Sequence, residues 1–181
     1  MRPLQNDQGF SFIELIVIVA LVATLASLST LLIQSFSTSY YLKQAVSHIV
    51  SQVQLARIYA IKNRTSTVVA FKPAAFTPGG RAGTFTIFED TNKNWKQDAG
   101  EKTILAESPM PPQISLTSAI FTSNGCGLAD LDTTCFGFDS QGLAARNGAA
   151  YVTGNIQLQD RKNETRTISF QVSGKSKVAT P

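Results

Sequence analysis

Residues 9–15 read GFSFIEL, and they open an apolar run that continues to Leu42 with no charged side chain after its glutamate. Leu, Ile, Val and Ala fill most of this run, and neither Gly nor Pro occurs between Phe10 and Lys72. About 20 apolar residues are enough to cross a bilayer as a helix, and no residue here is of a type that breaks one. The run therefore predicts a membrane-spanning helical segment over residues 10–36.

The apolar residues change their spacing after this run. They recur at steps of three and four residues, which places them on one face of a helix; they are Leu42, Ala45, Val46, Ile49, Val53, Ala56 and Ala60. We expect residues 37–64 to be the amphipathic second half of one continuous helix, which packs against a globular domain.

The remaining residues, 65–181, have the pattern of a β domain. Segments rich in Val, Ile, Thr and Phe are strand candidates: 67–71, 84–88, 102–106, 113–117, 151–158 and 165–172. Clusters of turn residues separate them, and Asn163 and Glu164 fit the tip of a hairpin between the last two candidates. The predicted fold class is α+β, with a long N-terminal helix packed on a C-terminal antiparallel β domain.

The boundary at Gly9 does not fit an ordinary secretory signal, in which a small-residue cleavage site follows the apolar core. Here the polar stretch comes first and the apolar run follows it at once. Residues 9–15 instead resemble the class III leader boundary of type IV prepilins and pseudopilins. The resemblance implies that a prepilin peptidase removes residues 1–9, cleaves between Gly9 and Phe10, and methylates the new amino group of Phe10.

Glu14 becomes the fifth residue of the mature chain by this numbering. A lone carboxylate near the start of a membrane helix costs several kcal/mol unless it is paired. The resemblance supplies the partner, the terminal amine of Phe10 in a neighbouring subunit, so that Glu14 would set the axial register during assembly. The alternative is a carboxylate that only reaches up to the lipid headgroups.

Further segments are similar to the GspH/FimT branch of pilin-like proteins. They occur in that branch's order and are Ala56-Arg57, Ala60-Ile61-Lys62, Phe88-x-Asp90, Phe138-Asp139-x-x-Gly142, Gly154-x-Ile156-x-Leu158 and Gly174-Lys175-x-Lys177. The resemblance implies a pilin fold that spans the bacterial inner membrane once, with residues 65–181 in the periplasm. Its implied partners are the prepilin peptidase, other major and minor pilins or pseudopilins, and the inner-membrane assembly platform.

The function implied is that of a minor pilin of a type IV pilus, which assembles into the filament or primes it. One alternative is a GspH-type minor pseudopilin of a type II secretion system. Another, of a different class, is a competence pilin that binds DNA. An enzyme is not expected, because no Ser/His/Asp set can be assembled around the only histidine, His48, which lies in a predicted helix and is expected on its exposed surface.

Oxygen-bearing side chains recur between positions 90 and 101 with the spacing of an EF-hand calcium loop: Asp90, Asn92, Asn94, Asp98 and Glu101. Trp95 stands where the sharp turn of such a loop needs Gly, and the flanking segments are predicted strands. Two interpretations therefore stay open, a calcium site and a turn without metal.

Cys126 and Cys135 are the only cysteines, and their spacing suits neither a zinc site nor a Cys-x-x-Cys redox centre. If the domain lies outside the cytoplasm, a disulfide that closes this short loop is expected; otherwise they are two free thiols.

The C-terminal segment carries the candidate DNA contact. Some FimT-like minor pilins capture DNA with a C-terminal Gly-Arg-x-Arg element, and this chain has lysines at the corresponding positions, Lys175 and Lys177. Lysine keeps the charge but lacks the bidentate geometry of arginine. The alternative is that both lysines are only solvated side chains of a chain whose net charge is +4.

Overall fold

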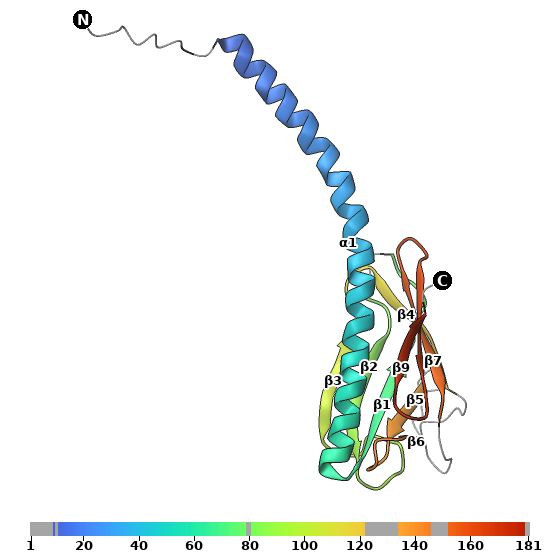
Figure 1. The fold of residues 1–181 in the computed structure, drawn as a ribbon. Helices are drawn as coiled ribbons and strands as arrows, with labels where there is room; N and C mark the ends of the chain where they lie inside the picture. The colour runs from blue at the N-terminus through green and yellow to red at the C-terminus, as the bar shows by residue number, and fades with distance from the viewer. Residues whose placement is uncertain (1–8, 10, 79–80, 122–133, 146–151, 180–181) are drawn as a thin grey trace, which may run out of the picture. The chain divides into compact units, whose positions relative to one another are not determined.

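The computed structural model describes residues 9, 11–78, 81–121, 134–145 and 152–179, without the side chains of residues 28–38. The chain divides into an N-terminal unit, Met1–Ser37, and a C-terminal unit, Thr38–Pro181, and each is described by itself. One helix, α1 (Phe12–Asn63), contributes to both units (Figure 1). Within the described residues, no helix is both long enough and apolar enough to cross a membrane. The span predicted for residues 10–36 stays a prediction.

The ends of α1 follow from local chemistry. The Ser11 carbonyl accepts hydrogen bonds from the backbone N–H groups of Glu14 and Leu15, at 3.0 and 3.2 Å, and Glu14 in the first turn complements the positive end of the helix dipole. At the other end, Arg64 takes a φ of 55°, a left-handed conformation that stops the helix.

The buried face of α1 in the C-terminal unit confirms the predicted amphipathic pattern. All seven apolar residues predicted for this face, from Leu42 to Ala60, are buried. They form one core with the inward side chains of two β-sheets. His48 departs from the expectation of exposed surface: it is half-buried, and its ring lies edge-on to Phe85, with 5.8 Å between the ring centroids.

Two antiparallel sheets complete the C-terminal unit (Figure 1). The first has the order β3-β2-β1-β5-β6 and the second has the order β4-β7-β8-β9. The strands are β1 (Ser66–Lys72), β2 (Thr84–Asp90), β3 (Thr103–Pro109), β4 (Ile114–Phe121), β5 (Thr134–Phe138), β6 (Ala144–Ala145), β7 (Gly154–Asp160), β8 (Thr165–Phe170) and β9 (Ser176–Ala179). We call the sheets A and B in that order.

All six predicted strand segments correspond to observed strands, with shifted ends. β4 begins at Ile114, one residue later than the predicted segment 113–117, because Gln113 has a φ of 66° and belongs to the preceding turn. The segment 151–158 is strand only from Gly154, and Tyr151 lies outside the described residues. β5, β6 and β9 were not predicted. They are short, and β9 has an exposed side chain at three of its four positions.

Phenylalanine rings join the two sheets. Phe136 of β5 in sheet A lies 4.8 Å from Phe121 of β4 and 4.9 Å from Phe170 of β8, both in sheet B, between ring centroids. Phe71 of β1 stacks on Phe136 at 6.1 Å. Aromatic pairs of this kind contribute about 0.5–1.5 kcal/mol beyond the area they bury, so this cluster fixes one sheet against the other.

Candidate assembly and binding sites

The residues predicted to be processed lie where α1 begins. Gly9 is exposed, and no heavy atom would lie within 4 Å of a Cβ placed on it. Phe10 lies outside the described residues. Glu14 is exposed on the first turn of α1, so its carboxylate is accessible to a group from another chain. The cleavage, the methylation and the pairing of Glu14 stay predictions.

The branch-specific segments that are separate in the sequence meet on the second half of α1. Arg57 donates a hydrogen bond from Nε to the carbonyl oxygen of Gly142, at 2.9 Å. Gln54 donates from Nε2 to the carbonyl oxygen of Gly174, also at 2.9 Å. The helix thus holds two turns that come 85 and 120 residues later in the chain.

Both of these turns need glycine. Gly142 and Gly174 have φ values of +76° and +75°, which L side chains rarely adopt. A Cβ on Gly142 would lie 2.5 Å from Cδ1 of Ile61, and one on Gly174 would lie 3.0 Å from Cδ of Arg57. The sequence contained the signal, two glycines after polar residues, but not their common partner.

The candidate calcium loop hydrogen-bonds to itself. Asp90 accepts from the backbone N–H of Asn94 through Oδ1, at 3.2 Å, and from that of Trp95 through Oδ2, at 2.9 Å. Glu101 accepts from the backbone N–H of Thr91 at 2.9 Å and from that of Asp98 at 3.1 Å. These carboxylates therefore already stabilise the turn.

Asp98 is the point at which the loop's amide side chains converge. The Nδ2 groups of Asn92 and Asn94 both donate to its Oδ2, and these two bonds lower the pKa of Asp98. Asp90 behaves in the opposite way: burial raises its pKa, against the lowering effect of the N–H groups of Trp95 and Asn94. The structure brings all five predicted residues into one loop, and both interpretations, a calcium site and a turn without metal, stay open.

Trp95 anchors this loop. In the sequence it stood out only as a departure from the calcium-loop pattern. It is buried, with a φ of 62°, in a second small core on sheet A with Val68, Ala70, Phe88 and Cys135. A Cβ on Gly137 of β5 would lie 2.9 Å from its ring. The tryptophan thus fixes the β2–β3 connection against the sheet.

Of the two cysteines, Cys135 is buried in β5 opposite Ala70 of β1. Cys126 lies outside the described residues. The Cys126–Cys135 disulfide stays a prediction.

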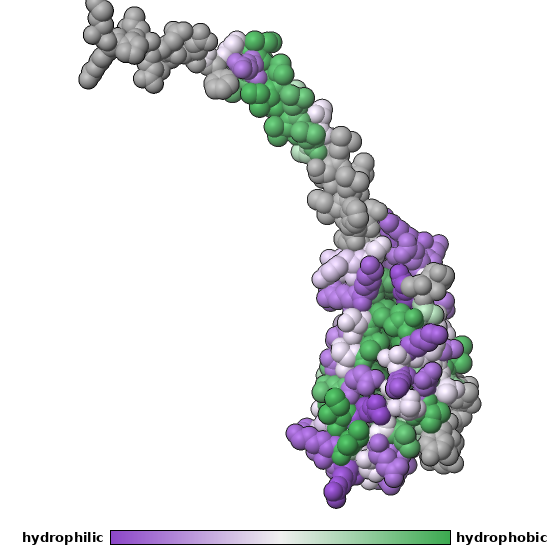
Figure 2. Space-filling view, in the orientation of Figure 1, coloured by the Kyte–Doolittle hydropathy of each residue, from purple (hydrophilic) through white to green (hydrophobic). Residues whose placement is uncertain are grey.

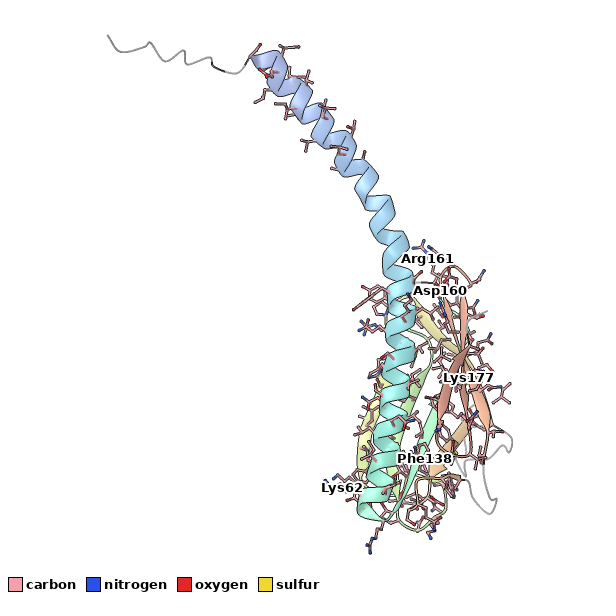
Figure 3. All side chains as sticks on the ribbon, viewed as in Figure 1. Lys62, Phe138, Asp160, Arg161 and Lys177 are labelled. Atoms are coloured by element: carbon pink, nitrogen blue, oxygen red, sulfur yellow. The ribbon has the colours of Figure 1, made fainter. Side chains whose placement is uncertain are left out.

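Lys175 and Lys177 lie on the β8–β9 hairpin, whose turn is the one that Gln54 holds. Lys175 accepts a hydrogen bond at its carbonyl oxygen from the backbone N–H of Gln171, at 2.9 Å. Lys177 is opposite Ser169 in the β8–β9 pair (Figure 3). The side chains of Lys175 and Lys177 are both exposed. The structure therefore presents both ammonium groups to solvent on an ordered hairpin.

Comparisons with known proteins found similarity over most of the chain. The family model described as "Type II transport protein GspH" matches residues 45–175. No curated protein matches the sequence. Among solved structures, the type IV minor pilin FimU of Pseudomonas aeruginosa is similar, with 12% sequence identity and a TM-score of 0.42 over 80% of this chain and 92% of that one.

Proposed function

This chain belongs to the GspH family, and on that premise we propose that it is a minor pilin, a subunit that joins or primes a type IV pilus through its N-terminal helix. The family's members are structural subunits of pili or pseudopili. The protein works by packing and not by turnover: its helix enters the filament core, and its β domain contacts neighbouring subunits.

The observation that carries this proposal is the surface of α1 in the N-terminal unit. Large apolar side chains are exposed there on consecutive positions, for example Leu15, Ile16, Val17 and Ile18, each with about half of its surface accessible. Figure 2 shows hydrophobic residues along this part of the helix. A helix that is apolar all round is buried in its working state, so this one needs lipid or other helices around it.

We propose that the inner membrane surrounds this part of α1 before assembly and that the filament core surrounds it afterwards, with the β domain in the periplasm. The support is the uncharged run from Leu15 to Leu42 and the leader motif at its start. Intact-mass spectrometry of protein from membranes should show a chain that begins at methylated Phe10. Gly9→Val should leave the leader in place. A Met1 terminus in cells with an active prepilin peptidase would contradict the proposal.

A periplasmic location implies that the Cys126–Cys135 disulfide forms, because disulfides persist in oxidising compartments. Protein exported to the periplasm should resist thiol alkylation at Cys126 and Cys135 until it is reduced. Free labelling of both cysteines without a reductant would show that the bond does not form.

The GspH-type pseudopilin of a type II secretion system is the alternative within the same class. Deletion of the gene distinguishes the two: a minor pilin should be needed for surface pili, and a pseudopilin for release of secreted enzymes.

DNA capture is the alternative from another class, and the exposure of Lys175 and Lys177 supports it. Lysines make salt-sensitive, sequence-independent phosphate contacts. In a mobility-shift assay, a Lys175→Glu/Lys177→Glu variant should lose binding that a Lys93→Glu/Lys96→Glu variant keeps. Equal binding by both variants would exclude this hairpin as the contact.

A further inference from the structure

Three basic side chains from three separate segments surround the start of α1 in the C-terminal unit. Lys43 is the first charged residue after the apolar run. One cleft, of about 800 Å³, is lined by Lys43 and by Arg81 of the β1–β2 connection. A second cleft, of about 300 Å³, is lined by Lys43 and by Arg166 of β8. Lys43 thus lies between two arginines that are distant from it in sequence.

The two clefts differ in their lining. The smaller one is apolar inside, with Val46, Val50 and Val178, and carries its two cations at Lys43 and Arg166. The larger one adds hydroxyl groups from tyrosines and serines of α1. Among the described residues that line either cleft, none is acidic. Both clefts therefore attract an anion, and the smaller one also has room for a few methylene groups.

Two tyrosines lie directly before the lysine. Tyr40 is 66% exposed, Tyr41 is half-buried, and both line the larger cleft. Tyrosine is enriched at membrane–water interfaces because its ring is apolar and its hydroxyl is polar. Along the chain, the uncharged run, the tyrosines and the lysine therefore follow one another in the same order as the hydrocarbon core, the interface and the headgroups of a bilayer.

The neighbouring β7–β8 hairpin adds to the positive charge. Arg161 lies at its tip, at the opposite end of the C-terminal unit from Lys62 (Figure 3), and hydrophilic residues gather at that end (Figure 2). Asp160 is fully buried, and its Oδ1 accepts from the backbone N–H groups of Lys162 and Glu164, each at 2.8 Å. Glu164 is the exposed carboxylate of this hairpin, so the cations outnumber it.

We propose that this end of the C-terminal unit binds anionic phospholipid headgroups. Lys43, Arg81 and Arg166 contact the phosphates, the tyrosines lie in the interfacial layer, and the smaller cleft receives part of an acyl chain. Each basic residue near an anionic membrane surface strengthens association by about fivefold. Binding would hold the β domain on the membrane until assembly withdraws the subunit. The inference rests on the membrane anchorage proposed above.

The test uses the full chain in nanodiscs of phosphatidylcholine, alone or mixed with phosphatidylglycerol, and compares two lysines within one molecule. A water-soluble amine-acetylating reagent should modify Lys43 several-fold more slowly when phosphatidylglycerol is present, whereas Lys62 should react equally in both. Native mass spectrometry should show preferential retention of phosphatidylglycerol.

An Arg81→Glu/Arg166→Glu variant should lose both effects, although its helix and Lys43 are unchanged. The matched control is Arg64→Glu/Lys96→Glu, which makes the same change of charge at the other end of the helix. Arg64 directly follows α1. Lys96 lies in the β2–β3 loop, which the pairing of Ser66 with Asp90 brings to that end. The control should keep both effects. Loss in the control, or persistence in the Arg81/Arg166 variant, would overturn the proposal.

Two other outcomes separate the rival explanations. If poly-glutamate protects Lys43 in phosphatidylcholine discs as well as phosphatidylglycerol does, the surface binds an acidic partner segment and the lipid proposal is wrong. A chain that does not insert into either disc contradicts the anchorage itself, and this inference with it. A chain that inserts but shows no lipid preference contradicts this inference alone.

Discussion

At the scale of single residues, two glycines allow the β domain to pack closely against α1, because each has a hydrogen atom where other residues carry a side chain. Gly142 and Gly174 present bare Cα atoms to Ile61 and Arg57, and both have positive φ values. Their carbonyl oxygens accept the hydrogen bonds from Arg57 and Gln54. A side chain at either position would therefore strain the backbone and displace the helix residues that hold the turn.

Gly142→Ala should destabilise the C-terminal unit by about 2–4 kcal/mol, because backbone strain at positive φ adds to overpacking against Ile61. The measurement is chemical denaturation. Gly100→Ala is the control: Gly100 has a φ of +102°, but no heavy atom would lie within 4 Å of its Cβ. The loss of stability should then be the backbone strain alone, about 1–2 kcal/mol. Equal losses would show that contact with the helix does not matter.

Asp90 makes a second residue-scale prediction, on pH. Asp90→Asn should lower the free energy of unfolding by about 1–3 kcal/mol. The reason is that an NH2 donor replaces one of the two oxygens that accept backbone N–H groups. Burial raises the folded-state pKa of Asp90 above the unfolded value near 3.8, so the folded chain binds this proton more tightly. The contribution of Asp90 to stability therefore falls as pH rises from about 4 through its raised pKa.

The stability advantage of the wild type over Asp90→Asn should accordingly be largest at the acid end of this range and shrink toward neutral pH. Denaturation of both proteins across that range measures it. An advantage that grows with pH would mean that the N–H groups of Trp95 and Asn94 outweigh burial.

At the scale of elements, the β2–β3 connection shows how one sequence pattern fits two structures. Its oxygen-bearing side chains have calcium-loop spacing, yet Asp90 and Glu101 accept backbone N–H groups, and Asp98 accepts two amide groups. Trp95 fastens the loop to sheet A. The loop is thus held by its own hydrogen bonds and one buried ring.

We expect excess calcium and a chelator to give the same thermal unfolding midpoint, because a cation would have to displace hydrogen bonds that already engage these carboxylates. Differential scanning calorimetry measures this. Trp95→Ala should lower the midpoint clearly under both conditions, through loss of about 3–5 kcal/mol of packing. A chelator-reversible rise with calcium would establish the metal site.

At the scale of the whole molecule, the chain combines two units with different requirements. The C-terminal unit has a continuous core of its own, formed by α1 and both sheets. The N-terminal unit exposes apolar side chains of α1 with Glu14 among them. The C-terminal unit buries its apolar side chains within the chain, whereas the N-terminal unit leaves those of α1 exposed.

Glu14→Ala should insert into the membrane but enter filaments less often. In the membrane, the carboxylate can reach the headgroups and its loss costs little; among packed helices, an unpaired terminal amine would be expensive. The ratio of filament-associated to membrane-bound protein measures this. Glu164→Ala, at an exposed carboxylate of the β domain, is the control. An unchanged ratio in Glu14→Ala would mean that helix packing alone recruits the subunit.

Local patterns in the sequence were sufficient for the helix and for most strands. The steps of three and four residues from Leu42 to Ala60 identified the buried face, because helical periodicity depends only on neighbours along the chain. The leader motif and the uncharged run to Leu42 are equally local patterns, and the processing and the membrane span that they indicate stay predictions. β5 and β9 were missed because five- and four-residue strands show too little alternation to be recognised.

Only the tertiary structure decided which distant residues meet. Nothing in the sequence pattern pairs β1 with both β2 and β5, or brings the turns at Gly142 and Gly174 to one helix face. The same holds for Arg81 and Arg166, which join Lys43 from separate strands and loops. The physical reason is that sheet order and helix contacts depend on burying one shared core, a property of the whole chain and not of any segment within it.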